Sequence, residues 1–218
     1  MGTMTGTTMT TEVRYNLGNR QSGGGGPTDA QILRYINWAY NHVARPTIYR
    51  HRELQTTQTN TLVETTAGYT LGTVPMAIFS VYNSTSEYKL SPRDIRVLDN
   101  TPSTAGRPSY YAVWGNTLQT SPTCGEDNDG DTLTTRYWQA PTAITTGTTA
   151  LRYEWDEVVV AGATWRGWIG LAEYERAMGA REHFGVLIQE VQDIMKIEGE
   201  DTGNVWEVEV GSYQRGDG

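Results

Sequence analysis

The stretch Gly106–Pro141, which reads GRPSYYAVWGNTLQTSPTCGEDNDGDTLTTRYWQAP, decides the fold because it interrupts helical sequence on both sides. A turn at Gly106 and Pro108 precedes a short alternating run, an acidic loop follows, and a second run leads to Pro141. Short alternating runs bounded by Gly and Pro are typical of β-strands. The stretch therefore predicts a small β unit inserted between helices.

The strand period extends over residues 48–151, where Thr, Val and Tyr dominate the runs. Six strand candidates fall in this range: His51–Thr59, Thr61–Thr65, Ala77–Tyr82, Ala112–Gln119, Thr132–Trp138 and Thr149–Tyr153. Their regular spacing favours a small barrel or sandwich. Ser91–Leu98 is ambiguous, because its Ser-Pro start is also typical of a helix cap and first turn.

Apolar residues at helical spacing predict three helices around this β region. The first begins at Thr28, which can cap the free amides, and ends near Arg45, before a proline. The second is expected over Trp155–Met178 and the third over Ala180–Lys196. These helices frame the β unit and form a helical body.

The second of these helices is apolar over much of its circumference. Such a helix is typically buried on more than one side, as in an oligomer. Gly162, Gly167 and Gly170 either permit the close approach of another helix or mark a break. We expect a ring interface at four large side chains of this helix: Trp155, Trp165, Trp168 and Ile169.

The two termini differ in pattern from the rest of the chain. Residues 1–27 are rich in Thr and Gly and have too little apolar surface for a core of their own, which predicts an extended arm. Near the other end, Trp206, Val208 and Val210 alternate with two glutamates, which is strand periodicity. A lone strand needs a partner edge, either in its own β unit or on a neighbouring protein.

Together these patterns predict an α+β fold with a helical body, an inserted small β barrel or sandwich, and extended arms at both ends. The expected divisions are an N-terminal arm at 1–27, a helical ring-forming domain at 28–46 and 154–198, an inserted β domain at 47–153, and a C-terminal docking arm at 199–218.

The formal net charge of −8 argues against nucleic-acid binding, which needs a basic surface. One cysteine, Cys124, allows no intrachain disulfide and fits folding in a reducing cytoplasm. We see no secretory signal, and no apolar run approaches the roughly 20 residues that span a bilayer. The last helices carry carboxylates that form either an ordinary solvated face or the negative lining of a ring: Glu173, Glu175, Glu182, Glu190 and Asp193.

No motif predicts catalysis, a metal or a cofactor. Asp127, Asp129 and Asp131 resemble the start of a calcium loop, but Trp138 stands where the closing Glu should be, which favours a solvated hairpin loop. The three histidines are far apart, which disfavours a zinc site, and no Gly-x-Ser-x-Gly elbow occurs. Cys124 has no sequence feature of an activated thiol. The sequence therefore predicts that the protein is not an enzyme.

The order and spacing of several short elements resemble the head-to-tail adaptor (connector, or tail accessory factor) proteins of tailed bacteriophages. The resemblance covers about Thr28 to Glu198. It rests on Ile36-Asn37-Trp38-Ala39 in the first helix, Tyr69-Thr70-Leu71 before Val81-Tyr82, Leu90-Ser91-Pro92, Gly106-Arg107-Pro108 with Tyr110-Tyr111, Leu118–Pro122, Leu133–Tyr137 with Pro141, and the closing helices. The Thr/Gly-rich arm and the long acidic loop depart from the family pattern.

The resemblance implies a structural virion protein, assembled in the host cytoplasm, that forms a ring of usually twelve copies beneath the portal. The helices would surround the DNA channel without binding DNA specifically, and the carboxylates named above would face it. The β unit would meet tail nozzle, tube or fibre proteins, and the C-terminal arm would dock on the portal through Trp206, Val208 and Val210. No membrane is involved in this arrangement.

Other classes of protein remain open at the level of sequence. The chain could be a different virion part, such as a tail-tube terminator or a capsid decoration protein. A glycan-degrading tail component would need two carboxylates facing each other across a cleft, and nothing in the sequence places two of them so.

Overall fold

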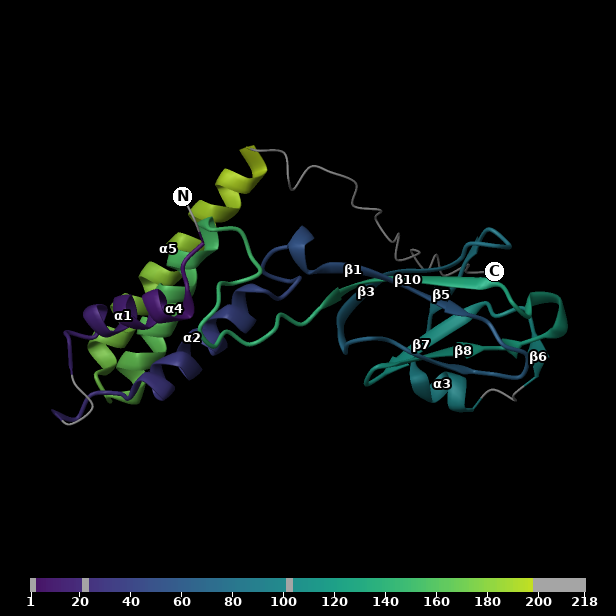
Figure 1. Cartoon of the computed structure of the whole chain (residues 1–218), viewed down its shortest axis with the longest axis horizontal. Coiled ribbons are helices and arrows are strands. Elements are labelled where there is room, and N and C mark those ends of the chain that lie inside the picture. The colour runs from purple at the N-terminus through teal and green to yellow at the C-terminus, as the bar shows by residue number, and fades with distance from the viewer. Residues whose placement is uncertain (1–2, 21–23, 101–103, 198–218) are drawn as a thin grey trace, which may run out of the picture.

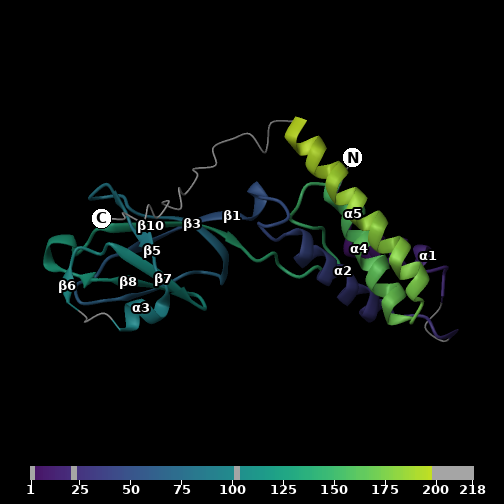
Figure 2. The same cartoon turned by 180° about the vertical axis from the view of Figure 1, so that it is seen from behind.

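The computed structural model describes residues 3–20, 24–100 and 104–197, which form two units along one long axis (Figure 1). The helical unit holds α1 (Gly6–Asn16), α2 (Asp29–Val43), α4 (Glu154–Gly170) and α5 (Tyr174–Ile197). The β unit, with the short helix α3 (Ile95–Asp99), lies in the chain between α2 and α4. Figure 2 shows the same division from behind. The α+β class and the insertion of β structure between helices agree with the sequence pattern.

The N-terminal segment is not an extended arm throughout, which corrects the expectation for residues 1–27. Thr5 caps α1 by accepting a hydrogen bond from the Thr8 amide. Met9, Val13 and Leu17 follow at intervals of four residues and are fully buried in the helical core. The physical reason is that this apolar stripe, hidden among threonines, finds its burial against α2 and α4 rather than within the segment itself.

The break between the last two helices lies earlier than the sequence pattern suggests. Helix α4 ends at Gly170, and Ala172 takes a left-handed conformation with φ of 59°. Glu173 then begins the next turn by accepting a hydrogen bond from the Ala177 amide. The expected boundary near Met178 is wrong because the apolar faces of the two helices cannot both reach the core along one straight axis.

Helix α4 is the central element of the helical unit and packs against α1, α2 and α5. At Gly162 an added Cβ would lie 2.9 Å from both the Ala39 Cβ and the Phe184 ring. At Gly167 it would meet the side chain of Leu17 at 2.7 Å. At Gly162 and Gly167 the alternative of close helix approach is therefore correct, and α4 continues through both. Gly170 is the last residue of α4 and lies at the break, and an added Cβ there would also meet the Tyr35 side chain.

The described residues of the β unit form two four-stranded sheets and one two-stranded pair. The first sheet is antiparallel, in the order β1 (Gln55–Thr61), β10 (Thr132–Gln139), β3 (Pro75–Asn83) and β4 (Tyr88–Lys89). The second has the order β2 (Gly68–Thr70), β8 (Thr117–Ser121), β7 (Tyr110–Trp114) and β5 (Ser91–Pro92), with β5 parallel to β7. Strands β6 (Ala105–Gly106) and β9 (Thr123–Cys124) pair in parallel.

Two short 3₁₀ turns, Arg52–Leu54 and Glu126–Asn128, complete the unit. Its core is separate from the helical core and holds Leu62, Tyr69, Leu71, Val81, Leu90, Tyr111, Leu118, Cys124, Leu133 and Tyr137.

The two sheets meet at two seams: the Gln58 side chain joins one, and the segment from β4 to β5 bridges the other over only part of its length. Between β1 and β2, Gln58 donates through Nε2 to the Thr70 carbonyl at 2.8 Å and accepts the Gly72 amide at 2.6 Å. On the other side β4 is only two residues long, so most of the β3 edge has no neighbouring strand among the described residues. A closed barrel, one of the two predicted alternatives, is therefore not confirmed.

Four strand predictions also change. His51–Thr59 begins with the 3₁₀ turn Arg52–Leu54 and becomes a strand only at Gln55. Ala112–Gln119 is a hairpin of β7 and β8, because Gly115 has φ of 60° and turns the chain at its middle. Thr61–Thr65 leaves the sheet after Thr61, and Thr65 takes a positive φ of 61°. Thr149–Tyr153 is an irregular segment in which Thr149 donates a hydrogen bond to the buried carboxylate of Asp156.

A buried aromatic cluster lies where the chain leaves the helical unit for the β unit. The His51 ring is 4.8 Å from Trp155 and 5.0 Å from Tyr49, measured between centroids. Its Nε2 donates to the Val43 carbonyl at 2.9 Å. Burial lowers the pKa of His51 from 6.5 to about 4, so the folded state holds a neutral imidazole.

We expect Gly162→Ala to lower the free energy of unfolding by about 1–3 kcal/mol, because the added methyl group must displace Ala39 or Phe184. Gly185→Ala is the matched control, since no atom of the described part of the chain lies within 4 Å of its added Cβ on α5. This control should stabilise the protein by up to about 1 kcal/mol through helix propensity. Urea unfolding measures both, and equal effects would contradict close packing at Gly162.

We expect His51 to make stability depend on pH between 6.5 and about 4. Its contribution is present above pH 6.5 and is lost as pH falls, because the unfolded chain takes up the proton first. Between pH 7 and 4.5 the loss should be about 2–3 kcal/mol.

Urea unfolding of the natural protein and of His51→Phe at both pH values measures this loss as the difference between their pH dependences. His183→Asn, at an exposed position, is the control and should keep the natural dependence. Equal pH dependence in His51→Phe and the natural protein would disprove the assignment.

Candidate assembly surfaces

Trp155, the first of the four expected ring-interface residues, lies inside its own chain. Its side chain is 1% exposed and packs against Tyr49 and His51. No surface is left for a neighbouring subunit, so the expectation for Trp155 is wrong. The sequence pattern could not separate a face covered by α2 and the β-unit junction from a face covered by another copy.

The two other tryptophans expected at the ring interface are covered in part by arginines of the same chain. Trp168 is 6% exposed, and the guanidinium groups of Arg20 and Arg176 lie 5.5 Å and 4.9 Å from its ring centroid. Trp165 is half-buried, with Arg181 at 5.7 Å. Such cation–π contacts let an arginine shield a ring while its charge stays in water. Trp165 and Ile169, both half-buried, keep surface that a neighbour could contact.

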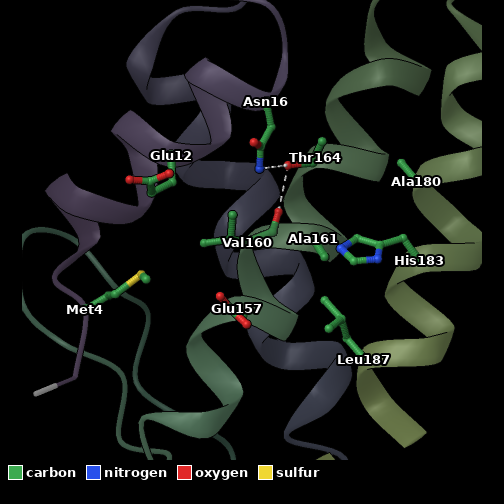
Figure 3. A pocket seen from close by; sticks show the side chains of 10 residues that line it. All are labelled: Met4, Glu12, Asn16, Glu157, Val160, Ala161, Thr164, Ala180, His183 and Leu187. Atoms are coloured by element: carbon green, nitrogen blue, oxygen red, sulfur yellow. Dashed lines mark hydrogen bonds between the residues drawn. The ribbon is translucent and has the colours of Figure 1, made fainter. Parts of the chain in front are cut away.

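A groove of about 450 Å³ runs over α4 between α1 and α5 (Figure 3). Its floor is formed by Val160 and Ala161, each 7% exposed, and Leu187 projects from α5 along one wall. Thr164 turns its hydroxyl to the Val160 carbonyl at 2.9 Å and accepts from the Asn16 amide at 3.5 Å. The rim is polar, with Glu12, Glu157 and His183.

The opposite flank of α5 projects large apolar side chains into solvent. Tyr174 is 67% exposed and Met178 is 74% exposed. At about 100° per residue, the nine positions from Met178 to Leu187 place these two side chains on opposite sides of the helix. The protomer therefore has an apolar-floored groove on one side of α5 and an apolar projection on the other.

This pair of surfaces was missed in the sequence because the helix break was placed too late. Once α5 is known to begin at Tyr174, the buried residues Ala177, Phe184 and Val191 fix its inner face. The flanks then follow from helical geometry.

Three of the five expected channel carboxylates form one row on α5. Glu175, Glu182 and Asp193 are exposed and are separated by seven and eleven residues. Those intervals return to nearly the same angle around a helix, on the side opposite Ala177 and Phe184. We call these three residues the acidic row. It lies between the two flanks of α5.

The other two carboxylates lie elsewhere. Glu190 is exposed but sits about 60° from the acidic row. Glu173 forms an ion pair with Arg20 at 2.7 Å, and that hydrogen bond holds the pKa of Glu173 below its ordinary value. Because Arg20 follows α1, the pair ties the N-terminal segment to the α4–α5 turn. The expectation that Glu173 faces a channel is not supported by this placement.

The acidic loop of the β unit is built around Asp131. Its Oδ2 accepts hydrogen bonds from Ser86 at 2.6 Å, Asn83 at 2.8 Å and Asn128 at 3.0 Å. The hydrogen bonds from the Ser86 hydroxyl and from the side-chain amides of Asn128 and Asn83 lower the pKa of the Asp131 carboxyl. Within the residues that the structure describes, no group of three or more His, Cys, Asp or Glu side chains is placed to hold a metal ion.

Cys124 is not a loop thiol but a fully buried residue at the end of β9. Burial is the largest cause of the raised pKa of its thiol. A buried, protonated thiol is a poor nucleophile and serves here as a small apolar side chain.

The expected portal-docking residues Trp206, Val208 and Val210 lie outside the described residues, and their role stays a prediction. Among the described helices, none is both long enough and apolar enough to cross a membrane.

Comparison with known families identifies the protein family, which the surfaces described above do not reveal. A family model described as SU10 adaptor protein matches residues 4–207 of the 218 in the chain. No curated protein matches the chain. The adaptor family consists of structural phage proteins and is not an enzyme family. Because the match covers almost the whole chain, the protein belongs to the SU10 adaptor protein family and is a structural adaptor of a bacteriophage virion.

Proposed function

We propose that the protein is a head-to-tail adaptor that forms a ring beneath the portal and joins it to the tail. The observation that carries this proposal is the family match over residues 4–207, together with a helical unit whose two sides differ in shape. Twelve copies is the number implied by the head-to-tail adaptors that the sequence resembles.

In this proposal each copy contacts its two neighbours in the ring through two different surfaces. A ring needs two different surfaces on each subunit, because an interface of identical patches closes as a dimer. The groove floored by Val160 and Ala161 offers one surface, and the projecting Tyr174 and Met178 offer the other. Insertion of the projection into the next copy's groove would cover apolar surface on both sides.

This arrangement leaves the acidic row free to face the channel. With neighbours on both flanks of α5 and the core on its inner face, the remaining side carries Glu175, Glu182 and Asp193. Such a wall repels phosphate weakly, since salt screens charges over about 8–10 Å. DNA would then pass without being held.

The β unit extends away from the helical unit and is proposed to meet tail or fibre proteins (Figure 1). Trp114, at the tip of the β7–β8 hairpin, is 72% exposed, and Val74 is 58% exposed. Large exposed aromatic residues are enriched where proteins bind one another.

We expect Met178→Glu to dissociate the ring, because it places a charge in the proposed apolar contact. A dodecamer of 24.2 kDa chains has a mass of about 290 kDa, which native mass spectrometry distinguishes from the single chain. Val97→Glu is the matched control, since Val97 is 52% exposed on α3 in the β unit.

The natural protein and the Val97 control should both give the ring mass, and Met178→Glu should give the monomer with unchanged helical circular dichroism. Six copies in the natural protein would favour a tail-tube terminator, and a trimer would favour a capsid decoration protein. Survival of the ring in Met178→Glu would overturn the proposed interface.

We expect the triple variant Glu175→Lys, Glu182→Lys, Asp193→Lys to retain DNA at low salt and release it as salt rises. Each substitution adds two charges, so the formal net charge rises from −8 to −2. A control with Lys at the exposed positions Glu53, Glu126 and Asp127 of the β unit has the same net charge.

Fluorescence anisotropy of labelled duplex DNA at 50 and 200 mM salt measures retention by the assembled rings. Only the variant of the acidic row should bind in a salt-sensitive way. Equal binding by the control would show that net charge matters and the position of the row does not.

A further inference from the structure

Among the described residues, the outer edge of β3 is open over its first part, where the segment from β4 to β5 has left β3 to pair with β7. On one side β3 pairs with β10 over most of its length, and on the other it pairs with β4 only at Tyr82 and Asn83. The last bond on that side runs from the Leu90 amide to the Val81 carbonyl. From Pro75 to Ser80 the edge has no backbone partner among the described residues. An unpaired edge is a template for another strand.

A groove of about 660 Å³ is lined by Ile78–Tyr82 of β3 and so overlaps this open edge at Ile78–Ser80. Its inner wall is apolar, with Ile78, Leu90, Pro92 and Tyr111 from both sheets. The residues on β3 before Val81 are all half-buried, which shows that neither face of this part of the strand is fully covered. The space therefore has the size and lining for side chains of one added strand, with a backbone edge ready to pair.

Among the described residues, the charged side chains that line the groove are both basic. Lys89 lies on β4, and Arg136 lies on β10 opposite Ser80. A strand that fits must place apolar side chains inward and can place acidic ones outward, where they meet Lys89 and Arg136. Alternation of just this kind occurs at residues 205–210, which read VWEVEV.

We propose that residues Val205–Val210 of the same chain add to the open edge of β3. Trp206, Val208 and Val210 would enter the groove, while Glu207 and Glu209 would face the two basic residues. This gives the terminal segment a partner edge in its own β unit, which is one of the two partners that its periodicity allows, in place of the portal docking that the family resemblance implies for these three residues. The proposal does not depend on ring formation.

The proposal requires the chain to reach this edge from the end of α5. Gln192, five residues before the end of α5, donates to the Ile48 carbonyl at 2.6 Å, which places this part of α5 beside the segment that leads into β1. Gln139 of β10 pairs with Pro75, which places the start of β3 at the same end of the sheet. The seven residues 198–204 span at most about 25 Å. A strand that enters at this end would run parallel to β3.

Amide hydrogen exchange of the full chain tests the pairing, with residue resolution by NMR. In the natural protein the edge amides of Ala77–Ser80 should exchange slowly. Deletion of residues from Gly203 onward, or Val208→Pro, should speed their exchange by about tenfold or more. Ser212→Pro, outside the segment, is the matched control and should leave it unchanged. Equal exchange at this edge in the full and truncated chains would overturn the proposal.

Zero-length carbodiimide crosslinking tests which residues meet and whether they belong to one chain. The sequence has two lysines, Lys89 beside the groove and Lys196 near the end of α5. We expect amide links from Lys89 to Glu207 or Glu209, identified by mass spectrometry and absent in Lys89→Gln. Links to Lys196 alone would contradict the groove as the destination.

A second crosslinking experiment decides whether the link forms within one chain or between two. It uses an equimolar mixture of unlabelled and ¹⁵N-labelled chains that have been exchanged through the monomer. Linked peptides of a single isotopic origin support pairing within one chain. Linked peptides of mixed origin would overturn it in favour of a neighbouring copy.

Discussion

The close approach of α4 to its neighbours is the constraint on which the helical unit depends. Gly162 brings the α4 backbone against Ala39 of α2 and Phe184 of α5, and Gly167 receives the side chain of Leu17 after α1. A helix surrounded in this way must be apolar on nearly all sides, since it meets a different helix on each. Most of the apolar surface of α4 is therefore buried within one chain, and only part of it remains for contacts with other copies.

That packing determines which surfaces remain for other molecules. With its inner face buried on α4, α5 presents a groove wall on one flank, an apolar projection on the other, and the acidic row between them. The arginines over Trp165 and Trp168 close much of the aromatic surface that sequence alone assigns to neighbouring copies. The proposed ring contact consequently lies on α5 and the groove more than on the tryptophans of α4.

The two units differ in how completely they are closed. The helical core has residues from every helix of its unit, including the N-terminal one. In the β unit one seam is joined by the Gln58 side chain, and the other is bridged by the segment from β4 to β5, which leaves the first part of the β3 edge open among the described residues. The apolar and basic side chains beside this open edge can accommodate one more strand with apolar and acidic residues in alternation. This is the physical basis of the inference about residues 205–210.

The sequence by itself determined the α+β class, the helix that begins at the Thr28 cap, the β insertion and the acidic, non-basic character of the chain. These follow from local rules of capping, period and charge, which act within a few residues. Tertiary structure alone decided the N-terminal helix, the break at Ala172 and the burial of Trp155. Each depends on which distant segment covers an apolar stripe, and a one-dimensional pattern does not record whether that cover comes from the same chain or from another.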